Sequence, residues 1–451
     1  MANARVSRSR MAAFKVLGEI RRRDARAREV LRSSKEFISL EARDKALATK
    51  LVLGVQASVG MLDACVNAYI HRGRLEPKVR DALRLGTYEL MFLDTPQSAA
   101  VSQAVELVRT TAPRATGLTN AVLRKVATNG VQERNESLAH VRGGNANTDE
   151  LALTSGYPGW LLEQVAQDRG ASAVHGLALS ALEPAPIYVA PNEALNTVQD
   201  VMRMLEEAGL EPHPEDACAI RLNAPSGLAT SGMVEDATVV VSDLSAQRIA
   251  RMVAPECDAR MLEVGQGRGT KSILMQNASL RAGAKLSITG VDVEEFKVRV
   301  AQERMVRAGV QNCVQCHVFD ALALASNNIP ASLSGSFDIV FVDAPCSGTG
   351  TMRRHPEIPW KLGRTSIDNL SSLQLRMLKA ASARVAPHGL LYYATCSVLK
   401  QEDEQVVRAF LNSKEGSEFE LTGEPFVSIP TVNGPDGHFC AALRNKTEDH
   451  N

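Results

Sequence analysis

The sequence predicts a multidomain protein in which an all-α domain precedes an α/β domain built on a parallel sheet. The length of 451 residues exceeds that of one ordinary domain. Between residues 6 and 128, apolar residues recur at three- and four-residue steps, which is the period of amphipathic helices. From residue 259 onward, short apolar segments alternate with helical stretches, as in a doubly wound sheet.

In the N-terminal part the helical period is clear, for example in Leu47, Leu51 and Val55, and it breaks at Pro96 and around residues 113–117. A polar stretch rich in Gly and Asn follows and is predicted to be a linker. The predicted domains are 1–130 (helical), 131–150 (linker), 151–255 (a mixed subdomain) and 256–451 (the α/β domain).

The α/β domain is expected to contain at least five strands with helices between them. The predicted strands are Met261–Val264, Leu286–Val291, Cys316–Val318, Phe337–Val342 and Gly389–Ala394, and the predicted helices are Lys271–Asn277, Glu294–Ala308 and Ser366–Val385. Ligands of such sheets bind beyond the carboxyl ends of the strands, so the residues at those ends are the candidates for function.

Composition narrows the class of protein. Hydrophobic residues make up 45% of the chain and charged residues 23%, as in soluble globular proteins. No apolar run approaches the ~18 residues of a membrane span. The segment Met11–Ile20 is amphipathic and leads into three arginines, so a secretory signal is not expected and the cytoplasm is the predicted compartment, with an organellar presequence as the minor alternative.

Charge and cysteine content leave two questions open. The formal net charge is zero, but residues 1–50 carry 14 Lys/Arg against 6 Asp/Glu, which fits either a phosphate-binding surface or a solvated helix face. Eight scattered cysteines form no disulfide framework. Cys313 and Cys316 are interpreted as two ordinary thiols, because no further ligands stand at zinc spacing, and no metal is predicted.

The first predicted strand runs into a loop with alternating glycines, Glu263-Val264-Gly265-Gln266-Gly267-Arg268-Gly269-Thr270-Lys271-Ser272. Gly265, Gly267 and Gly269 permit a tight turn and a close approach of a ligand to the backbone. The spacing fits neither a Walker A loop nor the dinucleotide motif. It resembles the glycine loop of S-adenosylmethionine methyltransferases, and a plain strand-to-helix turn is the alternative.

Acidic residues stand at the ends of three successive predicted strands: Glu263, Asp292 and Asp320. Asp292 is suited to accept hydrogen bonds from both ribose hydroxyls of a nucleoside, and Asp320 to meet an adenine amino group. The alternative is that each acid merely caps the helix that follows it.

Cysteines follow the fourth and fifth predicted strands, in Asp343-Ala344-Pro345-Cys346-Ser347-Gly348 and in Thr395-Cys396-Ser397. Carbon 5 of cytosine attacks a methyl donor only after a nucleophile has added to carbon 6, and a thiolate suits that role. A second polar group must help to remove the carbon-5 proton, and a carboxyl group can bind the amino edge of the base. Asp343, Cys346 and Cys396 supply these parts, unless both thiols are buried packing residues.

Two motifs, DAPCSGTGTMRRHPEIPW at 343–360 and ATCS at 394–397, resemble the RsmB/Sun group of bacterial ribosomal RNA cytosine-5 methyltransferases, within the NOL1/NOP2/Sun family. The resemblance extends over nearly the whole chain. Further matching segments are Arg43-Asp44, Leu83–Gly86, Ala99–Leu107 and Asn120–Arg124, which look like the NusB-type helical domain of this group, and Ser242–Gln247 and Asp436–Phe439.

The resemblance implies a NusB-like RNA-binding domain, a Rossmann-like catalytic domain and S-adenosyl-L-methionine as cofactor. It implies that Cys396 is the nucleophile, that Cys346 assists release of the methylated base and that Asp343 holds the cytosine while bordering the cofactor site. Lys271 stands where the family has its cofactor-loop lysine. The expected substrate is small-subunit (16S) ribosomal RNA, and the protein is expected to be a monomer.

One departure from the family concerns the cofactor loop, in which Gly265-Gln266-Gly267-Arg268 replaces the usual Cys-Ala-Ala-Pro. A non-catalytic RNA-binding or ribosome-assembly protein is therefore the main alternative, and a DNA or small-molecule methyltransferase is a third. Arg353 and Arg354 are expected to grip RNA phosphates and Trp360 to stack on a base, although a buried anchor is an equal interpretation of Trp360.

Overall fold

The computed structural model describes residues 6–70, 75–216 and 219–448, and the chain divides into two units. The helical unit comprises Met1–Pro184 and a later segment, Met352–Leu362. The sheet unit comprises Ala185–Thr351 and Gly363–Asn451. The chain therefore leaves the sheet unit once, just after the predicted cysteine turn, and returns to it.

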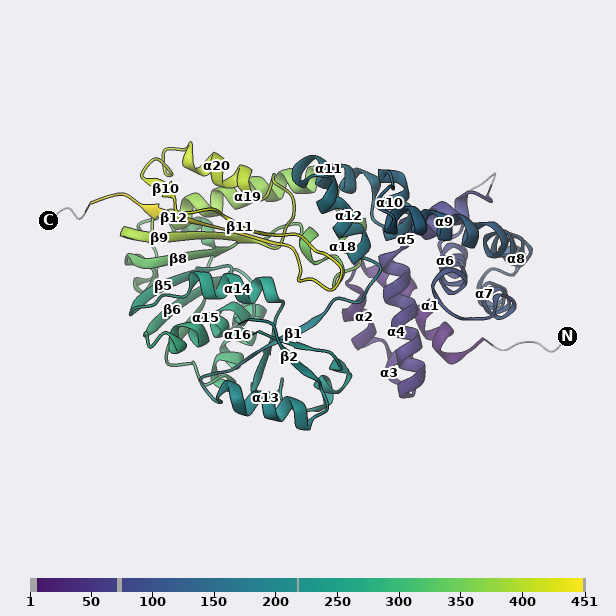
Figure 1. Ribbon diagram of the computed structural model, residues 1–451, viewed down its shortest axis with the longest axis horizontal. Coiled ribbons are helices and arrows are strands. Elements are labelled where there is room, and N and C mark those ends of the chain that lie inside the picture. Colours follow the sequence, from purple (N-terminus) through teal and green to yellow (C-terminus); the bar gives the residue numbers. More distant parts are fainter. Residues whose placement is uncertain (1–5, 71–74, 217–218, 449–451) are drawn as a thin grey trace. The chain divides into compact units, whose positions relative to one another are not determined.

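Helices account for the regular structure of the helical unit in the described part of the chain (Figure 1). They are α1 (Arg8–Arg23), α2 (Ala27–Ser33), α3 (Lys35–Ile38), α4 (Ala42–Ala57), α5 (Val59–Asn67), α6 (Pro77–Phe92), α7 (Gln97–Thr111), η1 (Pro113–Ala115), α8 (Thr116–Lys125), η2 (Val126–Gly130), α9 (Val131–Arg142), α10 (Thr148–Ser155), α11 (Gly159–Arg169), α12 (Ala171–Ser180) and α18 (Ile358–Lys361).

The core of this unit forms where α4, α6, α7 and α8 meet, and Gly86 on α6 allows their close approach. A Cβ atom at Gly86 would lie 2.8 Å from Leu123 Cδ1 and 2.9 Å from Ala104 Cβ. Leu51 and Leu83 are fully buried beside them. The apolar period of the sequence thus produces a helical core as predicted.

No single helix in the described ranges is long and apolar enough to cross a membrane. Helices α4 and α5 together have the length and composition of a membrane span, but they are bent by 75° at their junction. Its apolar residues, such as Val52 and Leu62, are fully buried in the helical core.

Residues 131–150 are largely helical, which differs from the predicted linker. Helix α9 buries only Val141, so its sequence lacks the apolar period that would reveal a helix. Helix α10 begins with a capping box, in which Asn147 and Glu150 satisfy each other's backbone N–H groups. Helices α10 to α12 cluster with the helical unit, so the predicted subdomain 151–255 is divided at residue 184.

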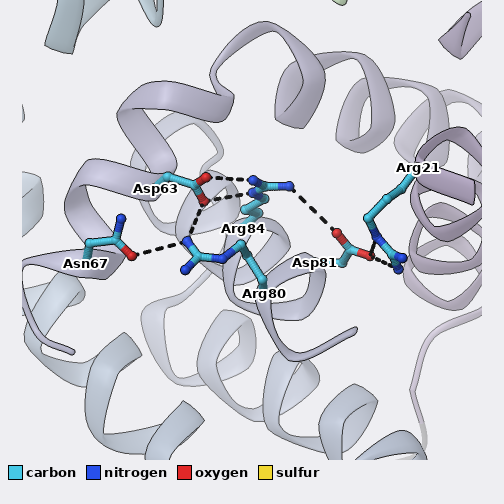
Figure 2. A network of polar contacts seen from close by, with 6 residues as sticks. All are labelled: Arg21, Asp63, Asn67, Arg80, Asp81 and Arg84. Carbon is cyan, nitrogen blue, oxygen red and sulfur yellow. Dashed lines mark hydrogen bonds and ion pairs between the residues drawn. The ribbon is translucent and has the colours of Figure 1, made fainter. Parts of the chain in front are cut away.

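A network of ion pairs links α1, α5 and α6 in the helical unit (Figure 2). Arg84 donates to both carboxylate oxygens of Asp63, at 2.8 and 2.6 Å, and Arg80 adds a bond of 3.1 Å to the same carboxylate. On the other side of Arg84, Arg21 donates to the buried Asp81 at 2.8 Å. Part of the basic N-terminal segment is thus neutralised within the unit.

The sheet unit contains two sheets. The smaller is antiparallel with the order β2-β3-β1-β4, and α13 packs on it; the larger has the order β10-β12-β9-β8-β5-β6-β7, with β11 paired to β12. The elements are β1 (Ile187–Pro191), α13 (Val198–Glu207), β2 (Pro212–Pro214), β3 (Ile220–Leu222), η3 (Pro225–Thr230), β4 (Val239–Val241), α14 (Leu244–Val253), β5 (Ala259–Val264), α15 (Thr270–Arg281), β6 (Leu286–Asp292), α16 (Glu295–Arg307), β7 (Val314–Val318), η4 (Ala321–Ala323), α17 (Ala331–Ser334), β8 (Phe337–Asp343), η5 (Thr349–Thr351), α19 (Arg364–Ser382), β9 (Val385–Thr395), α20 (Glu404–Leu411), β10 (Phe419–Leu421), β11 (Phe426–Ser428) and β12 (His438–Asn445).

The larger sheet confirms the predicted α/β class. Strands β7, β6, β5, β8 and β9 are parallel, and β12 adds an antiparallel partner to β9. Helices α14, α15 and α16 pack on one face and α19 and α20 on the other (Figure 1). Both faces are buried, which explains why the strands read as continuous apolar runs.

We predict that Asp63→Asn destabilises the protein by about 1–2 kcal/mol at pH 7, because two arginines lose a carboxylate partner. Burial opposes ionisation of Asp63, but Arg84 and Arg80 outweigh it and lower the pKa of this carboxyl. A lowered pKa stabilises the fold above the ordinary value of 3.8 and loses that effect as the pH falls below it.

Denaturant unfolding of both proteins between pH 7 and pH 3 tests this, and the difference should shrink below about pH 4. The matched control is Glu36→Gln, which removes the exposed ion pair with Lys15 and should cost less than about 0.5 kcal/mol. Equal costs for the two variants, or a cost independent of pH, would contradict the assignment.

Candidate active site

The loop after β5 and the turn after β8 touch, because the two strands are parallel neighbours in the sheet. Gly265 has φ +82°, and a Cβ atom there would overlap the backbone carbonyl of Asp343. This position therefore needs glycine both for its conformation and for the close approach. The predicted cofactor loop and the predicted catalytic turn thus lie side by side.

Asp292 at the end of β6 fixes the glycine loop. Its carboxylate accepts hydrogen bonds from the backbone N–H groups of Gly267 and Glu294, both at 2.9 Å. Gly269, with φ +73°, precedes the first residue of helix α15, and a Cβ atom there would lie 2.4 Å from Met305 Cε. The loop is thus held in a single shape although it lacks the family's usual Cys-Ala-Ala-Pro sequence.

Glu263 lies fully buried beneath the loop. Its carboxyl accepts a hydrogen bond from the Ser272 hydroxyl, which also accepts one from the Gln266 side chain at 3.0 Å. Burial raises the pKa of Glu263 to about 8. The side chain therefore braces the loop from below, and its predicted part in cofactor binding stays a prediction.

Lys271, at the start of α15, reaches across to the end of β8. Its Nζ lies 2.6 Å from Asp343 Oδ2. Burial opposes the charge on the lysine, but the negative Asp343 outweighs it and raises the pKa of Lys271. A cation is therefore held at the point where the cofactor loop meets the cysteine turns.

The two cysteines meet, as expected for adjacent parallel strands. Cys346 Sγ lies 3.3 Å from Cys396 Sγ, and the backbone N–H of Cys396 donates to Cys346 Sγ at 3.3 Å. The hydrogen bond from Cys346 lowers the pKa of Cys396, with a further contribution from Lys271. The same bond, together with burial, raises the pKa of Cys346 well above its usual range. The pair therefore ionises at Cys396 first, which suits a nucleophile.

Glu402 joins the two cysteine turns and has no counterpart among the predicted site residues. This side chain is fully buried. It accepts hydrogen bonds from the Ser347 backbone N–H at 2.8 Å and from the Ser347 hydroxyl. It also accepts from the Ser397 hydroxyl at 2.7 Å and from Gln374 Nε2 at 3.0 Å. One carboxylate thus fixes the residue after each cysteine.

The predicted adenine end of the site is more open. The Asp320 side chain is exposed and accepts a hydrogen bond from Leu322 N at 2.9 Å, so it caps η4. Val293 and Phe296 follow Asp292 and are 67% and 54% exposed. Two exposed apolar side chains beside a strand-end acid could pack against the face of a nucleoside base. In the sequence, only their position after Asp292 would have indicated them.

The three predicted RNA-binding residues lie in the segment Met352–Leu362 of the helical unit. Trp360 packs against Gly60, where a Cβ atom would overlap its ring. Arg28 Nε donates to the backbone carbonyl of Arg354 at 3.4 Å, and Lys361 Nζ lies 2.7 Å from Asp24 Oδ1. Trp360 therefore serves as an anchor, and the predicted contacts of Arg353 and Arg354 with RNA stay predictions.

Cys313 and Cys316 are free thiols; Cys313 is exposed and Cys316 is partly buried. Within residues 6–70, 75–216 and 219–448, no three or more His, Cys, Asp or Glu side chains are grouped as they would be around a metal ion.

We predict that Glu402→Gln destabilises the sheet unit by about 2–3 kcal/mol, because one carboxylate oxygen becomes an NH₂ group that faces donors. The same change should let the cysteine turns separate and slow alkylation of Cys396 at neutral pH. Thermal unfolding and timed iodoacetamide labelling followed by mass spectrometry measure the two effects. Glu424→Gln on the exposed surface is the matched control. Unchanged stability and labelling in Glu402→Gln would refute the bracing role.

Two parts of the chain match known protein families. Residues 250–444 match the family model described as 16S rRNA methyltransferase RsmB/F, and residues 7–128 match that of the NusB family. Ribosomal RNA small subunit methyltransferase B of Salmonella newport is 29% identical over 415 residues, which cover 90% of this chain and 91% of that protein.

Solved structures show the same fold. The crystal structure of PH0851 has a TM-score of 0.75 and 22% identity, and the match covers 97% of this chain and 98% of that one. NSun6 from Pyrococcus horikoshii, solved with SFG, has a TM-score of 0.53 and 15% identity over 64% of this chain and 99% of its own. Residues 250–444 are thus similar to the RsmB/F 16S rRNA methyltransferases and residues 7–128 to the NusB family, and the solved structures, at 22% and 15% identity, share the fold of this chain.

Proposed function

We propose that the protein methylates carbon 5 of a cytosine in small-subunit ribosomal RNA through a covalent bond between Cys396 and carbon 6. The observation that carries this proposal is the pair of sulfurs 3.3 Å apart, with the lower pKa on Cys396. Methylation of a base nitrogen or of a hydroxyl oxygen needs no thiolate, whereas carbon 5 of cytosine needs one.

The residues of the sheet unit fit the cofactor. Gly267 has φ +60°, and a Cβ atom there would have only the Gly265 carbonyl within 4 Å, so the loop presents bare backbone to a ligand. Asp292 would accept hydrogen bonds from ribose hydroxyls with the carboxylate lone pairs that the loop leaves unused. Val293 and Phe296 would cover the adenine, and Asp320 would meet its amino group. When bound, S-adenosylmethionine supplies a methyl group attached to a positively charged sulfur.

The chain's own residues then prepare the cytosine. Asp343 would bind the amino edge of the base and support positive charge at N3, which makes carbon 6 more electrophilic. Lys271 stabilises negative charge at the same place, both on Asp343 and on the Cys396 thiolate. The thiolate adds to carbon 6, and carbon 5 becomes nucleophilic. Because carbon 6 is unreachable within a stacked helix, the target cytosine must be single-stranded or flipped out.

The NusB domain is the proposed RNA-positioning part. In residues 1–50, several basic side chains are engaged in ion pairs, for example Arg10 with Glu89 and Lys15 with Glu36. The proposed RNA contacts are the exposed Arg22 and the half-buried Arg353 and Arg354. An RNA-binding protein without catalysis would have no use for two adjacent, partly buried thiols beside a lysine, which disfavours that alternative.

Bisulfite sequencing of ribosomal RNA from cells with and without the gene tests the proposal. One protected cytosine of the small-subunit RNA should be lost on deletion and restored by the wild-type protein. Cys396→Ala should not restore it, because no thiolate remains to attack carbon 6, while isothermal titration should still detect S-adenosylmethionine binding. Cys257→Ala, which removes an exposed thiol, is the matched control and should restore the signal. Full restoration by Cys396→Ala would overturn the assignment.

We predict that Cys346→Ala traps the protein on its RNA. Without the neighbouring thiol, departure of Cys396 from carbon 6 loses its hydrogen-bond donor, and the covalent complex should accumulate. A denaturing gel should show a slower band that disappears on ribonuclease treatment. A free protein band with normal turnover would count against this role of Cys346.

A further inference from the structure

His438 begins β12 beside the cysteine turns, and neither the sequence motifs nor the proposed mechanism gives it a role. Strand β12 is antiparallel to β9, with Phe439 paired to Thr395. His438 and Cys396 each lie one residue beyond that pair. There Cys396 leaves the ladder, because its backbone N–H donates to Cys346 Sγ at 3.3 Å and its carbonyl accepts from Gly350 N at 2.9 Å. Further along β12, Cys440 pairs with Ala394, and both pack in the same apolar cluster.

The His438 side chain is buried, with 6% of the residue exposed, and its Nδ1 has no hydrogen-bond partner among the described residues. An unpartnered buried polar atom destabilises the fold, so its presence calls for a functional explanation. The charges that act on the ring are those of Lys271 and Asp343 in the site and of Asp243 on its border, and the ring also contacts the backbone of Asp436. Asp243 also ties β12 to α14, because it accepts from the backbone N–H of Asp436 at 3.0 Å.

Burial and the positive charge of Lys271 lower the pKa of His438 to about 4, against smaller opposing effects of Asp243 and Asp343. The imidazole is therefore neutral at physiological pH and keeps a free lone pair. Cys346 is in the opposite condition, because its raised pKa keeps the thiol protonated. The imidazole can therefore accept a proton, and the Cys346 thiol can donate a hydrogen bond.

The proposed reaction requires a proton acceptor on the side of Cys396. If the thiolate adds to carbon 6 from one face of the cytosine and the methyl group reaches carbon 5 from the other, the hydrogen of carbon 5 turns toward the thiolate. That hydrogen is acidified by the adjoining protonated C4–N3 unit, so a weak base is sufficient to remove it. The acceptor must then lie close to Cys396, and His438 lies one residue beyond the last pair that β12 makes with β9.

We propose that His438 is a catalytic residue of the release step, which accepts the carbon-5 proton while Cys346 supports the departing sulfur. This inference rests on the proposed cytosine-5 chemistry. The C5–H bond breaks, and its electron pair forms the C5=C6 double bond. The C6–S bond breaks, and its pair leaves on Cys396 as thiolate, which accepts a hydrogen bond from the Cys346 thiol. The proton on His438 then passes to solvent.

Single-turnover assays on the full-length protein with ribosomal RNA and labelled S-adenosylmethionine separate the two steps. In His438→Ala and His438→Phe, methyl incorporation should stay within about threefold of wild type, and decay of the covalent complex should slow by about 10²–10⁴-fold. Added imidazole should accelerate that decay in His438→Ala, where a cavity replaces the ring, and not in Cys346→Ala. His438→Phe refills the space of the ring, so it keeps the test valid if the alanine variant does not fold.

Wild-type turnover in His438→Phe would overturn the proposal. So would loss of methyl incorporation in both variants with cofactor binding intact, because it would place His438 before methyl transfer. Failure of the underlying cytosine-5 chemistry is distinguishable, since the wild-type protein would then form no 5-methylcytosine and Cys346→Ala would form no covalent complex.

Discussion

The geometry of the cysteine pair depends on one buried carboxylate. Glu402 binds the residue after Cys346 and the residue after Cys396, so two turns that are 50 residues apart in sequence are joined at a single point. A carboxylate offers acceptors only, and the Ser347 amide, two hydroxyls and one side-chain amide satisfy them. Burying this group would be costly without those four donors, and with them it fixes the separation of the sulfurs.

Around Glu402 the neighbouring groups raise the pKa of Cys346 and lower that of Cys396. Lys271 lies on the Cys396 side and pairs with Asp343, while burial and the neighbouring thiolate act against ionisation of Cys346. Like-charged neighbours cannot both ionise in a site of low dielectric, so one proton stays between the sulfurs. Burial, together with the positive charge of the same lysine, lowers the pKa of His438.

The helical unit contributes through a segment of the chain that follows the cysteine turn. Residues 352–362 leave the sheet unit and pack with the N-terminal helices, with Trp360 against Gly60 and Lys361 on Asp24. Gly60 matters because any side chain there would occupy the place of the indole ring. Residues 352–362 follow Cys346 within one sequence motif, but in the structure they pack with the N-terminal helices.

The sequence alone determined the classes of structure and the chemistry at the strand ends. Apolar periodicity is a local property, and so it predicted the helical domain and the parallel strands, and the cysteine motifs predicted which turns would meet. Helix α9 was missed because a helix that is polar on nearly all sides carries no such period.

The braces and electrostatics were decided by the tertiary structure. Glu402 was not predicted from the sequence, and His438 lies in a matching segment that gave it no role. Both lie near the cysteine turns only because β8, β9 and β12 are neighbours in the sheet. Likewise Trp360 became an anchor through Gly60, 300 residues away in the chain. Burial, register and the partners of a charge depend on residues far apart in sequence, which is why no local pattern predicts them.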